Sequence, residues 1–214
     1  KQRGAILIGP AEGHLASGLV GLGRLVEPAD ILGQVRYLLS RNGPLKGVQV
    51  VVSAGGTQEA IDPVRLITNR SSGKQGYAVA QAALDYGAEV VLVSAPTALS
   101  APTGSRLVAL RSAAQMLEAV LDETTHADVL IMAAAVADFR PAQAASQKIK
   151  KQAGAPQLKL EPTADILAAV ARRRGQSGYP RRVIGFAAES QYLLENAQAK
   201  LSAKNLDLIV ANDI

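Results

Sequence analysis

No cysteine occurs in the sequence, which excludes thiolate nucleophiles, disulfides and zinc–thiolate sites. There are only two histidines, His14 and His126, and they lie far apart with no H-E-x-x-H arrangement, so a histidine-based metal centre is not expected. No apolar run approaches the ~20 residues that a membrane-spanning helix needs. Residues 1–9 lack the apolar region and cleavage site of a secretory signal. We therefore expect a cytoplasmic protein that does not engage a membrane.

Aromatic residues make up only 3% of the sequence, whereas basic residues are in excess and give a net charge of +5. A basic chain commonly binds either nucleic acid or small polyanions such as phosphates. Surfaces for single-stranded nucleic acid usually stack bases on aromatic side chains. The scarcity of aromatics therefore favours a phosphate pocket over a nucleic-acid partner.

The order of apolar and amphipathic segments predicts the fold from residue 48 onward. Buried strands are predicted at residues 48–53, 89–94, 106–110, 129–134, 182–186 and 206–211. Helices are predicted at residues 73–86, 112–123, 163–174 and 189–204, with a capping box at Ser112 and Gln115 and with Thr163 as a further cap. The alternation predicts a Rossmann-like α/β fold: a doubly wound, mostly parallel sheet with helices on both faces. Such sheets bind ligands at the carboxyl ends of their strands.

The usual nucleotide motifs are incomplete. The first strand ends in Ser53-Ala54-Gly55-Gly56-Thr57 instead of G-x-G-x-x-G, and no acidic residue follows the second strand. Both features argue against an NAD-dependent dehydrogenase. The segment that ends in Gly73-Lys74 lacks the first glycine and the final hydroxyl residue of a P-loop.

A first group of candidate residues lies between residues 54 and 77. The pair Gly55-Gly56 follows a buried strand and lets the backbone approach a ligand closely. Ser71, Ser72 and Gly73 then open a helix, where hydroxyls and free amides form an anion site at the positive helix end. The alternative is an ordinary helix cap preceded by a long surface loop.

Two further groups follow. Small residues at 133–135 leave room for a ring at the end of a strand, and Asp138 can bind Mg²⁺ or a ribose; the alternative is a tight turn with an exposed Asp. Lys148 opens a run of lysines that can clamp phosphates, although such a run is also typical of a solvated face. We interpret the arginines at 172–174, at the end of a helix, as structural.

Taken in order, five segments resemble the signatures of one family. They are AGGTQEAIDPVRLITNRSSGKQGYAVA, AAAVADFRP, KIKK, GFAAES and KNLDLIVAND. The family is phosphopantothenoylcysteine synthetase, the carboxyl-terminal half of the bacterial bifunctional coenzyme A biosynthesis flavoprotein. The segment LASGLVGLGRLVEP is similar to the tail of the decarboxylase half, with Ser17 where many decarboxylases carry a catalytic cysteine. The resemblance implies a decarboxylase tail and linker at residues 1–43 and a synthetase domain at 44–214, truncated at its C-terminus.

The activity that the resemblance implies is a two-step ligation. The carboxylate of 4'-phosphopantothenate attacks the α-phosphate of CTP, giving an acyl-cytidylate and pyrophosphate. The amine of L-cysteine then attacks the acyl carbon and releases CMP. Such chemistry needs charge neutralisation more than a nucleophilic side chain, which agrees with the absence of cysteine. Mg²⁺ is the expected metal, and the bacterial character of the KNLDLIVAND segment implies CTP and not ATP.

The resemblance also implies roles for individual residues. Asn69 matches the residue that holds the carbonyl of the acyl-cytidylate, and Lys148 matches the lysine of a flexible loop that closes over it. Asp138 matches the contact with the nucleotide and the metal. The remaining matches are residues around the base and ribose (Ala134, Ala135 and Phe186), residues along the phosphates (Gly55, Ser71, Ser72 and Gly73), and Arg65 in the substrate loop.

The resemblance implies a homodimer, and a higher oligomer when the flavoprotein half is present. FMN and decarboxylation are expected only in a full-length parent, not in this chain alone. Two other classes stay open at this stage. One is a nucleotide-binding fragment without catalytic activity. The other is a nucleic-acid-binding domain, which the basic charge and the runs of lysine and arginine would favour.

Overall fold

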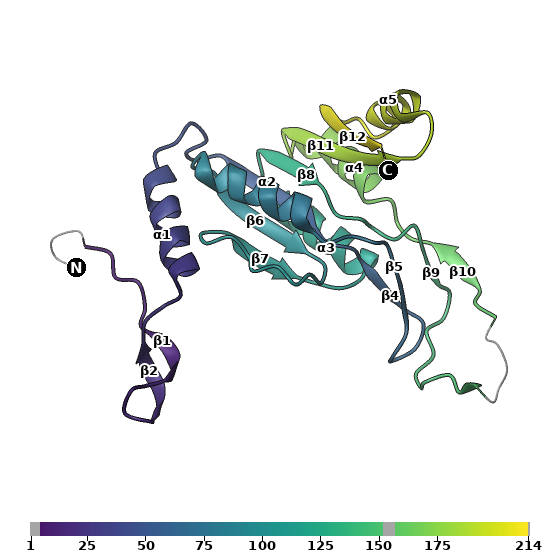
Figure 1. Ribbon diagram of the computed structural model, residues 1–214. Coiled ribbons are helices and arrows are strands. Elements are labelled where there is room, and N and C mark those ends of the chain that lie inside the picture. The colour runs from purple at the N-terminus through teal and green to yellow at the C-terminus, as the bar shows by residue number, and fades with distance from the viewer. Residues whose placement is uncertain (1–4, 152–156, 214) are drawn as a thin grey trace.

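The computed structural model describes residues 5–151 and 157–213, and its centre is a six-stranded sheet (Figure 1). The strand order is β12-β11-β8-β3-β6-β7, and every neighbouring pair is parallel. Lys1 and Ile214, the outer bounds of the two predicted domains, lie outside the described residues. The strands of the sheet are β3 (Gln49–Ala54), β6 (Glu89–Ser94), β7 (Arg106–Ala109), β8 (Val129–Met132), β11 (Arg182–Glu189) and β12 (Leu208–Asp213).

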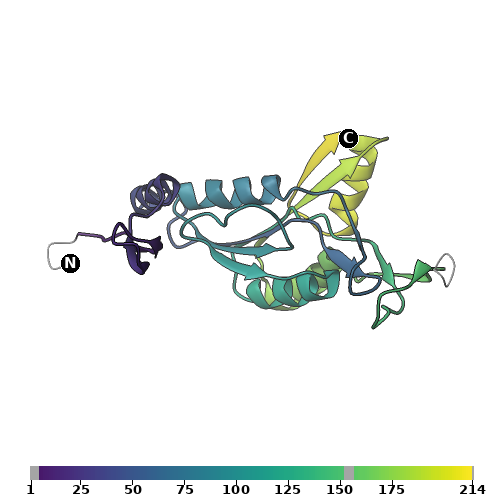
Figure 2. The same cartoon turned by 60° about the horizontal axis from the view of Figure 1, so that its bottom comes forward.

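Helices cover both faces of this sheet. In Figure 2 the blue helix α2 (Lys74–Asp85) lies on one side and the teal helix α3 (Ala113–Glu123) on the other. Helix α4 (Ile166–Ser177) packs on the α3 side, and α5 (Leu193–Ala203) packs against β11 and β12. The predicted Rossmann-like α/β fold is therefore confirmed. Within the described part of the chain, no helix combines the length and apolar character that crossing a bilayer requires.

Strand β3 shows why the central strands of the sheet are largely apolar. Val50 and Val52 point into the cluster under α2, whereas Val51 points into the cluster under α3 and α4. Successive side chains of a strand point to opposite faces, so a strand covered on both faces needs an apolar residue at every position. Each of these three valines is at most 3% exposed.

A close approach between α2 and β3 positions the helix at the end of that strand. A Cβ atom built on Gly76 would lie 2.6 Å from the Cβ of Ala54 and 2.8 Å from the carbonyl oxygen of Ser53. Only glycine therefore permits this packing. The amino end of α2 is thereby held beside the Gly55-Gly56 turn that follows β3.

Short antiparallel ribbons extend from the sheet. At the carboxyl edge lie the hairpin of β4 (Gln58–Ala60) and β5 (Leu66–Thr68) and the pair of β9 (Phe139–Pro141) and β10 (Leu160–Pro162), both projecting away from the sheet in Figure 1. At the other end lie the hairpin of β1 (Ala11–His14) and β2 (Val20–Arg24) and the helix α1 (Pro28–Ser40). None of the three ribbons was predicted from the sequence.

Two predicted helix starts are wrong. Thr163 does not cap α4, because the carboxylate of Asp165 accepts the hydrogen bond from the N–H of Ala168, and the helix begins at Ile166. The Thr163 hydroxyl instead donates to the carbonyl of Ala137 at 2.6 Å. The last helix begins at Leu193, not at residue 189, because β11 continues to Glu189. The capping box at the start of α3 is confirmed.

Candidate active site

A cleft of about 620 Å³ opens at the carboxyl ends of β8 and β11. Its walls come from five regions: the start of α2 with the residues before it, the end of β8, the end of β11, the start of α4, and α5 with the end of β12. It therefore lies where a parallel sheet of this kind binds ligands. The lining includes Asn69, Gln75, Ala134, Ala135, Val136, Asp138, Thr163, Asp165, Phe186, Lys200, Lys204 and Asn212.

Backbone contacts with the end of β3 hold the small-residue segment at the cleft. The N–H of Ala135 donates to the carbonyl of Gly55 at 2.8 Å, and the N–H of Thr57 donates back to Ala135 at 3.2 Å. The hydroxyl of the buried Thr57 accepts from the N–H of Ala137 at 2.8 Å. The segment after β8 is thus fixed although it lies outside the regular sheet.

Asn69 is tied to the same segment. Its side-chain Nδ2 donates to the carbonyl oxygen of Val136 at 2.9 Å. A Cβ atom on Gly56 would lie 2.8 Å from the carbonyl oxygen of Asn69, so a side chain at position 56 would displace Asn69. An amide nitrogen carries two N–H donors, and the described residues provide no partner for the second, which can donate to a ligand in the cleft.

The start of α2 lies beside Asn69. The hydroxyl of Ser71 accepts from the N–H of Gly73 at 3.3 Å, and that of Ser72 from the N–H of Lys74 at 3.4 Å. Gly73 is the N-cap residue in the left-handed conformation, and a Cβ atom on it would lie 3.5 Å from the backbone N and Cα of Gly55. The serine hydroxyls thus occupy these two N–H groups, whereas among the described residues the next two amides of the helix, of Gln75 and Gly76, have no partner, and Gln75 lines the cleft.

Two lysines of the cleft were not predicted from the sequence. Lys200 of α5 donates through Nζ to the carbonyl of Phe186 at 2.8 Å, and Lys204, one turn further, pairs with Asp165. Burial by itself raises the pKa of Asp165, but the Lys204 ammonium, the N–H of Ala168 and the charge of Lys200 outweigh burial and lower this pKa. The available signal was the spacing of four residues, which places both lysines on one face of a helix.

Asp138 lies exposed at the cleft, and its carboxylate receives no hydrogen bond from the described residues. In the described part of the chain, no group of three or more His, Asp or Glu side chains is placed to hold a metal ion. The single carboxylate of Asp138 at the cleft fits Mg²⁺, which is often bound by one or two carboxylates together with the phosphates of a substrate.

Lys148 and Arg65 are not brought into the cleft. Neither is among the described residues that line it. Arg65 follows the turn of the β4–β5 hairpin, and Lys148 lies in the segment between β9 and β10. These two segments contact each other, because the Arg65 guanidinium donates to the carbonyl of Ile149 at 3.0 Å. The predicted site residues thus fall into three sets. Asn69, Ala134, Ala135, Asp138 and Phe186 line the cleft, Gly55, Ser71, Ser72 and Gly73 lie beside it without lining it, and Arg65 and Lys148 lie on the ribbons.

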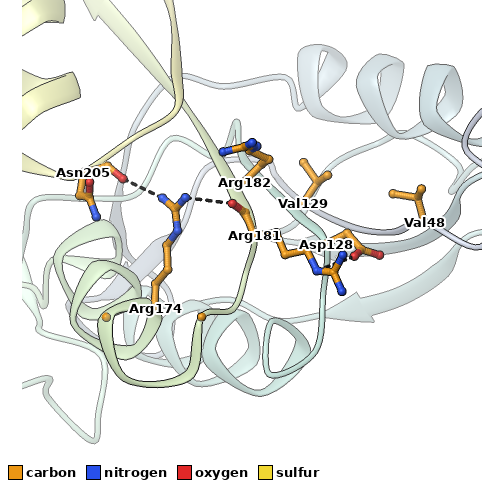
Figure 3. Close-up of a pocket in the computed structure, with 9 residues that line it drawn as sticks. Val48, Asp128, Val129, Arg174, Arg181, Arg182 and Asn205 are labelled. Carbon is orange, nitrogen blue, oxygen red and sulfur yellow. Dashed lines mark hydrogen bonds and ion pairs between the residues drawn. The ribbon is translucent and has the colours of Figure 1, made fainter.

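A second hollow of similar size, about 620 Å³, lies at the opposite edge of the sheet (Figure 3). Three arginines line it, and each guanidinium already has a carboxylate partner. Arg174 and Arg182 pair with Asp207, and Arg181 pairs with Asp128. Arg174 also donates to the backbone carbonyls of Asn205 and Arg181, as the dashed lines in Figure 3 show. Arg174 thus fastens the end of α4 to the sheet, which agrees with the structural interpretation of this residue.

The carboxylate of Asp207 should therefore stabilise the fold in a pH-dependent way. Burial raises its pKa, but the N–H of Val183 and the guanidinium groups of Arg174 and Arg182 outweigh burial and lower it. A lowered folded-state pKa contributes stability that is complete above the ordinary value of 3.8 and is lost as the pH falls through the folded value. We expect Asp207→Asn to lower the free energy of unfolding at pH 7 by about 2 kcal/mol.

Urea unfolding at neutral and acidic pH measures this difference. The curves of the wild type and of Asp207→Asn should converge at the acidic end of the titration. Asp122→Asn, at an exposed position of α3, should change the stability by less than about 0.5 kcal/mol. A difference that stayed constant down to the lowest pH would contradict the assigned role of the Asp207 charge.

A parallel α/β sheet with a ligand-sized cleft at the carboxyl ends of its strands defines the class of Rossmann-like ligand-binding domains. Within this class, a family model described as the DNA/pantothenate metabolism flavoprotein C-terminal domain matches residues 45–214, and the chain belongs to this family. The resemblance stated from the sequence motifs is thereby confirmed.

Curated relatives cover the whole chain. The coenzyme A biosynthesis bifunctional protein CoaBC of Bacillus subtilis is 47% identical over 216 residues, which is 100% of this chain and 52% of that protein. CoaBC of Mycobacterium tuberculosis is 46% identical over 226 residues, which is 100% of this chain and 54% of that protein. The chain thus spans about half the length of the curated relatives it matches.

Solved structures agree with this assignment. The C-terminal domain of CoaBC matches with a TM-score of 0.68 and 44% identity, over 78% of each chain. A mutant of Cab2, solved in complex with phosphopantothenate-cysteine, matches with a TM-score of 0.66 over 87% of this chain and 77% of its own. Its identity is 18%, so this second likeness concerns the fold alone.

Proposed function

We propose that this chain is the synthetase part of a coenzyme A biosynthesis enzyme and joins 4'-phosphopantothenate to L-cysteine with the use of CTP. The observation that carries the proposal is the cleft at the carboxyl edge, where Asn69, Ala134, Ala135, Asp138 and Phe186 lie together. These residues come from motifs far apart in the sequence. Membership of the family adds independent support.

The nucleotide is expected to lie along the cleft from the start of α2 to the end of β11. The free amides of α2, with Ser71, Ser72 and Gly73, suit the phosphates, because the amino end of a helix favours negative charge. Ala134 and Ala135 leave space for the pyrimidine ring beside the half-buried Phe186. Mg²⁺ held by Asp138 would neutralise part of the phosphate charge.

The reaction needs no nucleophilic side chain. In the first step a carboxylate oxygen of the substrate forms a bond to the α-phosphorus of CTP, and pyrophosphate leaves. In the second step the cysteine amine bonds to the acyl carbon, CMP leaves, and the amine proton is lost to solvent. Asn69 is proposed to hold the acyl carbonyl, and Lys200 and Lys204 to add positive charge near the nucleotide.

We also propose that the enzyme works as a homodimer. Arg65 and Lys148, which the resemblance gives to the substrate side, lie on ribbons that project away from the central sheet (Figure 1), and neither residue lines the cleft. Either a second copy of the chain or a movement of the ribbons would bring Arg65 and Lys148 to a cleft. The decarboxylase tail at residues 1–43, the cytoplasmic location, and the FMN of a full-length parent remain predictions.

Pyrophosphate release tests the proposed function directly. Mixing the protein with 4'-phosphopantothenate, CTP and Mg²⁺ should release pyrophosphate, and adding L-cysteine should yield the amide and CMP. Retained CTP binding without pyrophosphate release would favour the alternative of a catalytically incomplete nucleotide-binding fragment. Failure to bind CTP at all would reject the proposal.

Nucleotide choice gives a further expected result. CTP at a hundredfold its Kd should stabilise the fold by ~2.7 kcal/mol, because a ligand that binds only the folded state shifts unfolding by mass action. ATP at the same concentration should give a smaller shift, since the space beside Ala134 and Ala135 is assigned to a single ring. Thermal unfolding with each nucleotide measures both shifts, and equal shifts would remove the pyrimidine assignment.

A further inference from the structure

A fully buried carboxylate lies outside the cleft, at the turn between β4 and β5. The side chain of Asp62 is 0% exposed. Burying a charge is costly unless hydrogen bonds and opposite charges compensate it. Asp62 must therefore have enough partners to stay ionised, and those partners indicate what the residue does.

The two oxygens of Asp62 have different partners. Oδ1 accepts from the N–H groups of Val64 and Arg65, both at 2.8 Å, and these contacts close the hairpin turn. Oδ2 accepts from the N–H of Ile149 at 3.2 Å, which lies 87 residues away in sequence, and is 3.3 Å from the Arg65 guanidinium. One oxygen therefore shapes the turn, and the other binds a distant segment.

Two more hydrogen bonds join the same turn and segment. The N–H of Ala145 donates to the carbonyl of Ile61 at 2.9 Å, and Arg65 donates to the carbonyl of Ile149 at 3.0 Å. Residues 145–149 are thus attached to the turn at both ends. Lys148 lies within this attached stretch, next to the residue that Asp62 holds.

The turn alone does not require a carboxylate. Asn and Ser also accept hydrogen bonds from backbone N–H groups two or three residues further on, which is all that Oδ1 does here. An Asn or Ser at position 62 would lack the second acceptor, which here accepts from the N–H of Ile149. Burial raises the pKa of Asp62, but the N–H groups of Val64, Ile149 and Arg65 and the Arg65 charge outweigh it and lower this pKa, so the attachment persists in mildly acidic solution.

We propose that Asp62 is a positioning residue of the ligase, which fastens the segment carrying Lys148 to the β4–β5 hairpin and so sets where the Lys148 ammonium stands. Asn69 follows β5 of the same hairpin. Because the segment is fastened there, Lys148 has a defined position relative to the side-chain amide of Asn69, which is proposed to hold the acyl carbonyl. The part that concerns catalysis rests on the proposed function of Lys148.

Asp62→Asn is the sharpest variant. Its remaining oxygen can still close the turn, whereas its NH₂ group faces the N–H of Ile149 and cannot accept from it. In hydrogen–deuterium exchange of the 214-residue chain, peptides spanning residues 145–151 should exchange about tenfold faster, as expected on losing a hydrogen bond to a charged acceptor. Peptides from β3 and β8 serve as the internal standard for an intact fold.

Glu59→Gln is the matched control. Glu59 is another buried carboxylate of the same hairpin, 5% exposed, and its Oε1 accepts from the N–H of Ala113 at 2.7 Å, away from residues 145–149. This variant should leave exchange at residues 145–151 unchanged. Equal exchange in Asp62→Asn and the wild type, with the sheet intact, would overturn the proposal.

Kinetics separate positioning from a general structural effect. In a full-length parent, Asp62→Asn should slow pyrophosphate release about tenfold, but less than about twofold when Lys148 is already Gln, because a residue that acts through Lys148 has nothing left to position. Equal losses in both backgrounds would overturn the positioning role. An inactive wild type would instead reject the proposed function, while faster exchange in Asp62→Asn would still support the fastening of the segment.

Discussion

Replacing Asn69 with Asp should leave pyrophosphate release largely intact and reduce coupling to cysteine by a factor of about 10² to 10³. Asn69 lies between the Gly55-Gly56 turn and the start of α2, and its Nδ2 is oriented by a 2.9 Å hydrogen bond to the carbonyl of Val136. From there the amide can donate to the acyl carbonyl while the phosphates are held at the helix. A hydrogen bond that strengthens as charge develops on that oxygen lowers the barrier of the second step alone.

The Asp substitution removes the donor and adds a negative charge, so a neutral control is needed. Asn69→Ala removes the donor without the charge and should also accumulate the acyl-cytidylate. Mass spectrometry of quenched reactions can follow the acyl-cytidylate, the amide and CMP separately. If Asn69→Asp stopped pyrophosphate release while the fold and CTP binding stayed intact, Asn69 would belong to the activation step.

The central sheet could be predicted because burial on both faces leaves a strong local signal. The central strands β3, β6 and β8 are nearly continuous apolar runs. Helix patterns lie between most of the strands along the chain. The ribbons leave no such signal. Strands β4, β5, β9 and β10 have three residues each, too few for an alternation of apolar and polar positions to be recognised.

Helix starts were predictable only where the capping contacts are unambiguous. Ser112 and Gln115 form both halves of a capping box, and the structure has both hydrogen bonds. Thr163 and Asp165 are both good capping residues two positions apart, so local preference does not choose between them. Tertiary structure decides, because the hydroxyl of Thr163 donates to the carbonyl of Ala137 in the segment after β8.

The cleft residues fall into predictable and unpredictable sets for a related reason. Ala134, Ala135 and Asp138 follow β8, and Phe186 lies in the second half of β11. The topology of a parallel sheet gathers the carboxyl ends of its strands at one edge. A lysine pair on a helix is usually a solvated face, so the position of Lys200 at the carbonyl of Phe186 depends on the packing of α5.

Long-range backbone contacts leave no local signal at all. The sequence marks Asp62 only as a turn residue before proline, and its contact with the N–H of Ile149 spans 87 residues. The sequence motifs gave roles to Arg65 and Lys148 separately. That both lie on one fastened unit outside the cleft is visible only in the structure.

Replacing Lys148 with Gln should slow both halves of the reaction, each by a factor of about 10². Its ammonium is exposed, and the adjacent Ile149 is fastened to the β4–β5 turn through both its N–H and its carbonyl. A cation held in this way can neutralise phosphate charge when pyrophosphate leaves and again when CMP leaves. Gln preserves most of the length of the side chain and removes the charge, so the loss reports on electrostatic stabilisation.

Lys159→Gln provides the comparison, because Lys159 is an exposed lysine just before β10 on the same ribbon. It should change either half-reaction by less than about twofold, as an exposed charge away from the reacting groups contributes little. Quenched-flow measurement of pyrophosphate and of the cysteine amide gives the two rates for each variant. A loss confined to the cysteine step in Lys148→Gln, or an equal loss in Lys159→Gln, would show that Lys148 is not a phosphate clamp for both steps.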